Sequence, residues 1–314
     1  MNQISTLPVC RLFFCVLIFS LCSTKSGIAQ AQTESVTMAA DKGNARAQYE
    51  LAQNFAKGNG VSKDYAKAAQ YMRLSAEQGY AEAQIALGAF YGRGQGVPRN
   101  VTTAVQWYRK AADQGNPLAQ YAMGNFYADG RGVTNDYTEA VRWWRKAAEQ
   151  NQVDAQVALG KMHLFPGAFG TNYLDFAEAG RWFHRAAKLG SAAAMNQLGE
   201  MYDNGLGVKI NFSTAANWYR AAAELGDEGG QANLGQLYFA GRGVPRDYVQ
   251  AYKWLKLGAN QGNPIAANFI GNFHTKPLLT PEQLVEAEKL VQDFKPKSGV
   301  TNEIKEASAT KIGG

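Results

Sequence analysis

Small and apolar residues recur along most of the chain at helical spacing, and short glycine-containing turns interrupt them. In the second copy of this pattern, Ala83, Leu87 and Tyr91 fall on one face of a first helix. A Gly-x-Gly-Val turn follows in most copies, and glycine suits the left-handed backbone conformation that ends a helix. We therefore predict a helix, a tight turn and a second helix in each copy.

The second helix of each copy has its own start signal and its own packing face. Ala104 and Trp107 illustrate the face, in which a small residue lets two helix axes approach and an aromatic residue fills the space between them. A single pair of short helices cannot bury such a face alone, so the pattern favours stacked pairs. Asp and Asn are preferred helix N-caps, and one of them opens each second helix at the same register: Asp64, Asn100, Asp136, Asp175, Asn211 and Asp247.

The period of the repeat is constant along the array. Successive copies are 36 residues apart, except for 39 residues between the fourth and the fifth. Helix–turn–helix units with a period in the mid-thirties are typical of α-solenoids. We therefore predict an array over residues 43–275, in six copies and a half, which begin at Gly43, Gly79, Gly115, Asn151, Gly190, Gly226 and Gly262.

The shared skeleton resembles the Sel-1-like repeat family, a relative of the tetratricopeptide repeats. It reads Ala…Leu-Gly…Tyr…Gly-x-Gly-Val…Asp-Tyr…Ala…Trp-Tyr…Ala-Ala…Gly. The resemblance implies an all-α fold, a right-handed α-solenoid superhelix of stacked helix–turn–helix repeats. Two copies depart from it: copy one has Tyr71-Met72 where Trp-Tyr is usual, and copy four has His163 for the tyrosine and three extra residues before Asp175.

Residues 1–31 have the features of a secretory signal peptide. Arg11 supplies a positive charge, residues 12–22 are apolar, and an Ala-x-Ala site predicts cleavage between Ala31 and Gln32. Two other interpretations stay open: a lipoprotein anchored through Cys22, and an uncleaved anchor. The signal-peptide interpretation predicts a periplasmic or secreted protein with no stable membrane span after cleavage.

The segments that flank the array are short. Residues 32–42 are expected to be a lead-in. Thr280, Pro281 and Gln283 match a capping box with proline at the first helical position, which predicts a C-terminal capping helix over residues 276–295. Residues 296–314 are polar and are predicted to be disordered.

Catalytic and metal-binding patterns are not evident in the sequence. All three cysteines lie within residues 1–31, so the predicted mature chain has no thiol chemistry. The histidines are too scattered for a zinc site: we expect His163 to be a packed core residue and His184 to be solvated, and His274 lies in another repeat. The glycine-rich turns lack the Lys-Ser/Thr ending of a phosphate loop. We therefore predict no enzyme activity, no cofactor, no metal and no nucleic-acid binding.

Basic residues share one register near the end of the second helices, and we call this set the basic row. Cations at a helix C-terminus complement its dipole. The same residues could instead meet an anionic partner such as peptidoglycan or another envelope polysaccharide. The basic row consists of Arg73, Arg109, Arg145, His184, Arg220 and Lys256.

The first helices carry a face that differs from copy to copy, and we call it the variable face. In solenoids of this kind the first helix lines the concave surface, and aromatic residues among polar groups suit protein recognition. An ordinary solvated surface is the alternative. The variable face comprises Arg46, Tyr49, Gln53, Glu82, Ile85, Leu118, Tyr121, Asn125, Lys161, Asn196, Glu200 and Gln236.

The extra residues of copy four form an apolar and aromatic insertion. Insertions in repeat proteins map to loops on one face, which is often a binding face. Phe165 and Phe169 either fold back onto their own repeat or form an exposed contact patch.

Taken together, these observations and the family resemblance predict a non-catalytic protein–protein interaction scaffold of the bacterial cell envelope, whose protein partner the sequence does not identify. A peptidoglycan- or polysaccharide-binding protein is one alternative. A β-lactamase-like hydrolase is another, since some cysteine-rich relatives carry that assignment, but this chain lacks their cysteines in its mature form.

Overall fold

The computed structural model describes residues 33–165, 174–276 and 278–297. Every regular element within these ranges is an α-helix. The chain divides into two compact units, Met1–Asp136 and Tyr137–Gly314, which we call unit 1 and unit 2. The predicted all-α repeat fold is therefore confirmed.

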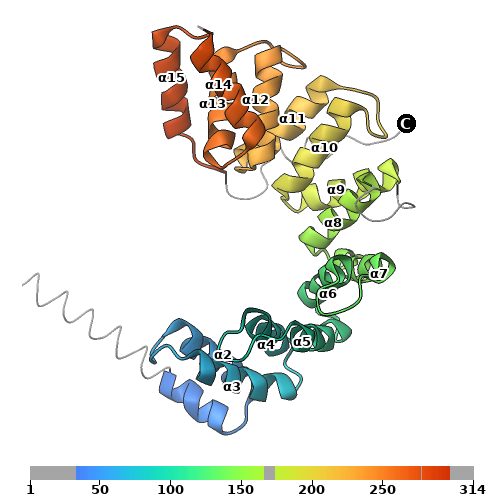
Figure 1. Ribbon diagram of the computed structural model, residues 1–314, viewed down its shortest axis with the longest axis vertical. Coiled ribbons are helices and arrows are strands. Elements are labelled where there is room, and N and C mark those ends of the chain that lie inside the picture. The colour runs from blue at the N-terminus through green and yellow to red at the C-terminus, as the bar shows by residue number, and fades with distance from the viewer. Residues whose placement is uncertain (1–32, 166–173, 277, 298–314) are drawn as a thin grey trace, which may run out of the picture. The chain divides into compact units, whose positions relative to one another are not determined.

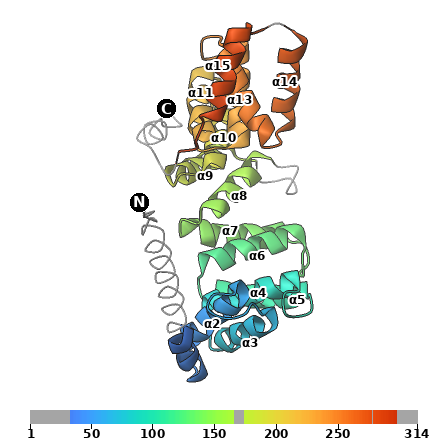
Figure 2. The same ribbon diagram turned by 90° about the vertical axis from the view of Figure 1, so that its left-hand side faces the viewer.

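Unit 1 is built of alternating first and second helices, as the sequence predicts. A helical stretch over residues 33–41 precedes them, so the predicted lead-in is itself helical. Figures 1 and 2 show α2 beside α3 and α4 beside α5, the two helices of the first and of the second repeat. The helices are α2 (Ala45–Lys57), α3 (Tyr65–Glu77), α4 (Ala81–Arg93), α5 (Val101–Asp113) and α6 (Pro117–Asp129).

Unit 2 continues the same alternation and ends in an additional helix. In Figure 1, α12 to α15 lie at the end coloured orange to red. The helices are α7 (Tyr137–Glu149), α8 (Val153–Leu164), α9 (Phe176–Lys188), α10 (Ala192–Asn204), α11 (Phe212–Glu224), α12 (Glu228–Ala240), α13 (Tyr248–Asn260), α14 (Pro264–Thr275) and α15 (Pro281–Gln292).

The helix ends carry the caps that the sequence predicts. Asn116 and Asn263 cap α6 and α14 ahead of a proline in the first turn. A side-chain oxygen accepts from the first-turn backbone at five of the predicted second-helix caps, which satisfies N–H groups that would otherwise have no partner. These five caps are Asp64, Asn100, Asp175, Asn211 and Asp247.

Two glycine positions allow close packing, one within a repeat and one between neighbouring repeats. A Cβ atom at Gly88 would lie 2.7 Å from the ring of Tyr108, so the glycine of the Leu-Gly pair receives an aromatic side chain of the second helix. Gly96 has φ +65°, and a Cβ there would lie 2.0 Å from the carbonyl oxygen of Tyr65 in the preceding repeat. The turn therefore requires glycine for its conformation and also for its contact.

Buried glutamines join each repeat to the one before it, and we call them the glutamine row. The Nε2 atom of each donates to a carbonyl oxygen eight residues earlier, at distances of 3.0–3.3 Å. Each of these carbonyl oxygens also accepts from a backbone N–H three residues on, so the glutamine adds a second hydrogen bond at the helix end. The row consists of Gln48, Gln84, Gln120, Gln156 and Gln231.

The C-terminal helix α15 forms the predicted capping box. The Thr280 side chain and the Gln283 side chain each accept from the backbone of the other residue. The helix packs on α13 and buries Ala287. Beyond it, Lys297 returns to α11, where its Nζ lies 2.7 Å from a carboxylate oxygen of Glu224. Of the predicted disordered tail, residues 298–314 lie outside the described ranges.

Candidate functional site

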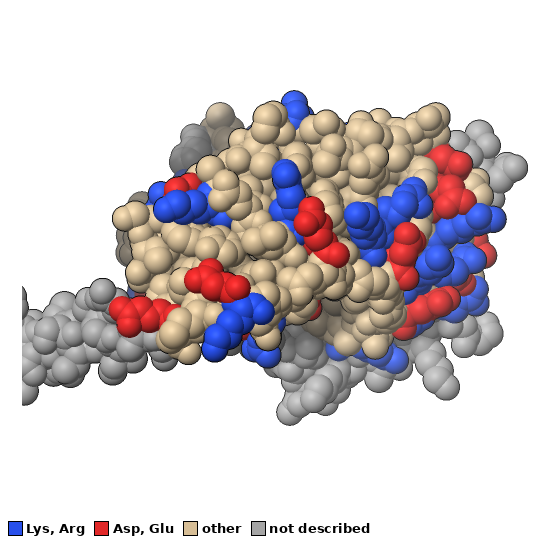
Figure 3. Space-filling view, turned by 90° about the horizontal axis from the view of Figure 1, so that it is seen from below, with Lys and Arg blue, Asp and Glu red and all other residues tan. Residues whose placement is uncertain are grey.

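Three arginines of the basic row make contacts between neighbouring repeats. Arg73 and Arg220 donate to the hydroxyl groups of Tyr91 and Tyr238, at 2.5 and 3.2 Å. Arg109 donates in the same way to Tyr127. Each bond joins a second helix to the first helix of the next repeat, so these guanidinium groups act within the fold. On the face drawn in Figure 3, basic side chains are interspersed with acidic ones.

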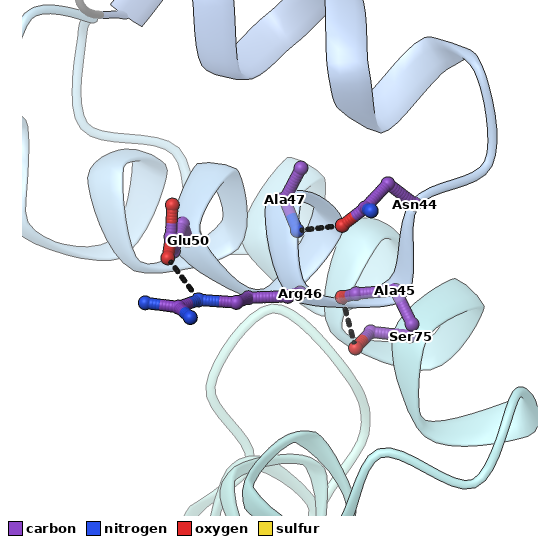
Figure 4. A network of polar contacts seen from close by, with 6 residues as sticks. All are labelled: Asn44, Ala45, Arg46, Ala47, Glu50 and Ser75. Carbon is purple, nitrogen blue, oxygen red and sulfur yellow. Dashed lines mark hydrogen bonds and ion pairs between the residues drawn. The ribbon is translucent and has the colours of Figure 1, made fainter.

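The variable face of unit 1 begins with an ion pair beside two aromatic rings. The Nε atom of Arg46 lies 2.9 Å from a carboxylate oxygen of Glu50, one helical turn away (Figure 4). Tyr49 packs against Tyr80 with ring centroids 5.3 Å apart. Burial raises the pKa of Tyr80, and the carboxylate of Glu82 raises it further. The structure therefore brings three of the predicted residues, Arg46, Tyr49 and Glu82, around the ring of Tyr80.

The network in Figure 4 also holds the start of α2 in place. The Asn44 side chain accepts from the backbone N–H of Ala47 at 2.9 Å and caps the helix. The Ser75 hydroxyl, from the second helix of the same repeat, donates to the Ala45 carbonyl oxygen at 2.6 Å. Arg46 and Glu50 consequently project from a helix whose first turn is fixed on two sides.

The other predicted residues of unit 1 are more dispersed. Gln53 lines a hollow of about 860 Å³ together with Glu50 and residues of the helical stretch 33–41. Leu118 is 52% exposed, whereas three other side chains of the variable face are half-buried, namely Ile85, Tyr121 and Asn125.

Unit 2 joins several predicted residues in a single hydrogen-bond network, which we call the amide–carboxylate cluster. Glu200 accepts from Asn196 through one carboxylate oxygen and from Gln197 through the other, both at 2.9 Å. Asn233 of α12 donates to the Asn196 side-chain oxygen at 3.0 Å, and Gln236 donates to Asn233 at 3.4 Å. The cluster therefore links α10 to α12 across two repeats.

Two further charged groups act on this cluster. Burial raises the pKa of Glu200, while the hydrogen bonds from Asn196 and Gln197 and the charge of Lys161 oppose that rise. Burial also raises the pKa of Asp227, the N-cap of α12. A Cβ atom at Gly229 would lie 3.0 Å from Asn196 Nδ2 and 3.3 Å from Asp227 Oδ1, which places the Asn196 amide close to the Asp227 carboxylate.

Sequence reasoning missed two members of this cluster, Gln197 and Asn233, and also the neighbouring carboxylate of Asp227. A signal was available, because Gln197 and Asn233 occupy the seventh position after the start of their repeats. Three of the other copies have alanine at that position: Ala86, Ala122 and Ala158. Adjacent helical positions are about 100° apart, so the polar surface extends one position beyond the predicted face.

Some of the predicted site residues lie at the margin of the described chain. Phe165 is 45% exposed at the end of α8, and Leu174, on the other side of the insertion, is 51% exposed. Phe169 lies outside the described residues, and so does the predicted cleavage site between Ala31 and Gln32.

The histidines differ from one another in their surroundings. His163 is 8% exposed, as predicted for a core residue. The prediction of a solvated His184 is wrong: its ring packs edge-on against Trp218 at 5.4 Å, and its Nε2 atom is buried without a hydrogen-bond partner. Burial, with a smaller contribution from Lys188, lowers the pKa of His184 to about 4. The ring consequently stays neutral at pH 7.

Neither metal binding nor membrane insertion finds support within the described ranges. No group of three or more His, Cys, Asp or Glu side chains there is placed to hold a metal ion. Among the helices of those same ranges, none has the length and apolar character needed to cross a bilayer.

Comparison with known proteins identifies the repeat. The Sel1 repeat family model matches six consecutive segments, residues 45–80, 81–116, 117–152, 153–191, 192–227 and 229–263. Proteins built of these repeats are generally interaction scaffolds and typically non-catalytic. No curated protein matches the chain.

Two crystal structures resemble the chain closely enough to support more than the fold. One is a protective antigen present in uropathogenic Escherichia coli strains, which displays an SLR fold; the identity is 37% and the TM-score 0.72 over 83% of this chain. The match spans only 56% of that antigen. The other is a Sel1 repeat protein from Oxalobacter formigenes, with 31% identity and a TM-score of 0.66 over 80% of this chain and 99% of that protein.

Proposed function

Because this chain belongs to the Sel1 repeat family, we propose that it is a non-catalytic scaffold of the bacterial cell envelope that binds a protein partner through its variable face. The single observation that carries the proposal is that some repeat positions have the same structural contact in several copies and others do not. The glutamine row and three arginines of the basic row are at equivalent positions and make the same bond in several copies, whereas the residues of the variable face change from copy to copy.

The chemistry of the variable face supports a protein as the partner. Unit 1 offers Tyr49, Leu118 and Tyr121 beside the Arg46–Glu50 ion pair. Aromatic and apolar side chains among polar groups are the composition of protein-binding hot spots. A polysaccharide bound through the basic row is less well supported, since three of its arginines already donate to tyrosine hydroxyls.

The envelope location rests on the N-terminal sequence. Arg11, the apolar residues 12–22 and the Ala-x-Ala site that ends at Ala31 have the order of a secretory signal. One similar protein is a protective antigen, which supports a place outside the cytoplasm. A fractionation of cells that express the tagged chain tests this: recovery in the periplasm or medium is the expected result, and recovery in the cytoplasm alone would contradict it.

The binding proposal is tested by replacing Tyr49, Leu118 and Tyr121 together with alanine. Capture of the partner by crosslinking of the tagged protein in cells should weaken about tenfold or more, because hot-spot side chains each contribute at least about 1–2 kcal/mol. The far-ultraviolet circular dichroism should not change, since Tyr49 and Tyr121 are only half-buried and Leu118 is exposed. Undiminished capture would contradict the proposal.

The matched control replaces three exposed residues of second helices, Gln70, Gln106 and Asn217, with alanine. This variant should capture the partner as the wild-type chain does. If the control loses as much capture as the first variant, the variable face is not the binding surface.

A further inference from the structure

We propose that the amide–carboxylate cluster of unit 2 receives a positively charged side chain, lysine or arginine, from an extended segment of the partner protein. This inference rests on the proposed scaffold function and names the chemistry of one recognition site within it. The residues that carry it are Glu200, Asp227, Asn196, Gln197 and Asn233.

The charge balance of the cluster favours a cation. Glu200 and Asp227 supply two carboxylates, and Glu228 acts on Asp227 as a third. Lys161 is the one cation that acts on both Glu200 and Asp227 in the described chain. One more positive charge from a partner would therefore be attracted to the site, and a negative one repelled.

A buried acceptor beside Glu200 also points to a missing donor. Gln197 is 8% exposed, and its Nε2 donates to Glu200. The Oε1 of the same amide is buried and has no hydrogen-bond partner. A buried acceptor without a donor costs about 1–3 kcal/mol. An ammonium or guanidinium group carries several N–H donors, so it can satisfy this oxygen and a Glu200 oxygen together.

The burial of the two carboxylates also favours binding of a cation. Burial raises the pKa of both Glu200 and Asp227, which means that their negative charge is poorly solvated in the free chain. A cation bound nearby stabilises the charged form of each. Binding should therefore lower both pKa values.

The amides of the cluster suit the backbone of an extended peptide. Asn196, Asn233 and Gln236 form a connected line from α10 to α12. Side-chain amides both donate and accept, as do the N–H and C=O groups of a peptide. A segment laid along this line could place a lysine or arginine at Glu200 and Asp227. A divalent metal is disfavoured as the occupant, since no metal-holding group exists among the described residues.

The test is a nuclear magnetic resonance titration of the purified, ¹⁵N-labelled chain. The probe is a short Gly-Ser peptide with two lysines, and matched peptides carry norleucine or glutamate in place of both lysines. The side-chain amide signals of Asn196 and Asn233 report on binding. The lysine peptide should shift both signals at up to millimolar concentration, and its affinity should fall as salt screens the charges.

The decisive variant is Glu200→Gln, which should lower the affinity for the lysine peptide by about tenfold or more. Its fold should persist, because the Gln197 amide can turn over and accept from the new side-chain amide through its unpaired oxygen. The matched control is Glu77→Gln in unit 1, which removes the same charge from an exposed position of α3, outside the cluster and outside the variable face. That variant should bind as the wild-type chain does.

Several results would overturn the inference: no shift with the lysine peptide, equal binding of the norleucine or glutamate peptide, or an affinity that Glu200→Gln leaves unchanged. Capture of a partner in cells by a chain that ignores the lysine peptide would overturn this inference and leave the scaffold function standing. Binding of the lysine peptide by a chain that captures no protein would uphold the recognition chemistry and contradict the scaffold function.

Discussion

The glutamine row differs between the two units, at positions that the repeat makes equivalent. In unit 1, Gln48 and Gln84 accept from Gln78 and Gln114, at 2.7 and 2.8 Å. In unit 2 the residue equivalent to Gln78 and Gln114 in copy four is Leu189, and the buried Oε1 of Gln156 has no partner. The same repeat position is therefore satisfied in one unit and unsatisfied in the other.

Copies five and six show two ways of avoiding a buried oxygen without a hydrogen-bond donor at this position. In copy five both members are apolar, Met195 and Leu225, and both pack in the hydrophobic core of unit 2. In copy six Gln231 again accepts from Gln261, at 2.8 Å. Losing both partners of a buried hydrogen bond is nearly neutral, whereas losing one leaves a desolvated group without a partner. Copy four is thus the weak point of the row.

Copy four also departs from the basic row. Where unit 1 has Arg73 and Arg109, each bonded to a tyrosine of the next repeat, copy four has His184 packed on Trp218. An arginine stays charged at any pH that a protein encounters, while a neutral buried histidine must gain a proton as the pH falls. This difference makes the stability of unit 2 depend on pH at His184.

The largest expected effect is this pH dependence. His184 has a pKa of about 4 in the folded chain and an ordinary value of 6.5, so the unfolded chain takes up the proton first. The stability that neutral His184 contributes is present above pH 6.5 and is lost as the pH falls from 6.5 to 4, by up to about 3 kcal/mol. Urea unfolding at a series of pH values measures it.

His184→Gln is the control for this prediction, because it removes the titrating group. Burial raises the pKa values of Glu200 and Asp227, so protonation of these two groups stabilises the folded chain as the pH falls. The contribution of His184 is therefore the difference between the free energies of unfolding of the wild-type and variant chains at each pH. Parallel pH profiles for the wild-type and variant chains would contradict the account.

The second prediction reproduces in unit 1 the unpaired glutamine oxygen of copy four. Gln78→Leu leaves the Gln48 oxygen buried without a donor and should lower the free energy of unfolding by about 1–3 kcal/mol. Urea unfolding followed by circular dichroism measures it. Gln70→Leu, at an exposed position of the same helix, is the control and should change stability by less than about 0.5 kcal/mol.

The third prediction replaces both glutamines of this pair in unit 1 with the apolar residues of copy five. The double change Gln48→Met and Gln78→Leu should bring stability back to within about 1 kcal/mol of wild type, because no buried acceptor is left unpaired. A double-mutant cycle gives the coupling between the two positions. If the losses in free energy of unfolding of the two single variants simply add, the two glutamines do not stabilise the chain as a hydrogen-bonded pair.

The smallest expected effect comes from supplying a hydrogen-bond donor to the buried glutamine oxygen of copy four. Leu189→Gln places a donor near the Gln156 oxygen and should stabilise the chain by about 0.5–1.5 kcal/mol. Leu225→Gln is the matched control, because its neighbour Met195 offers no strong acceptor. If Leu225→Gln stabilises the chain equally, the gain does not come from the Gln156 oxygen.

The sequence predicts the fold well because its signals are local. Asp64 and Asn100 at one register, the Gly-x-Gly-Val turns and the Thr280–Gln283 box each act within a few residues, and the structure shows all of them in place. The period then carries these local signals along the array. The polar pairs between repeats were not predicted, because Gln48 and Gln78 are brought together only by the packing of separate helices.

The candidate site was predicted in part for the same reason. Asn196, Glu200 and Gln236 were identified by their register, and the structure joins them in one cluster. His184 was misjudged because its register suggested a solvated cation, while its surroundings depend on Trp218 of the next repeat. Register predicts which positions share a face, but the side chains that meet across repeats decide what each position does.

Site-specific photo-crosslinking in cells can show whether a protein partner binds the variable face. A photoreactive residue is placed at Leu118 or Lys161 on first helices and, for comparison, at Gln106 or Asn217 on second helices, all of them exposed positions. We expect one dominant protein adduct from Leu118 and Lys161 and none from the other two. Adducts from the second-helix positions alone, or no protein adduct from any position, would contradict this expectation.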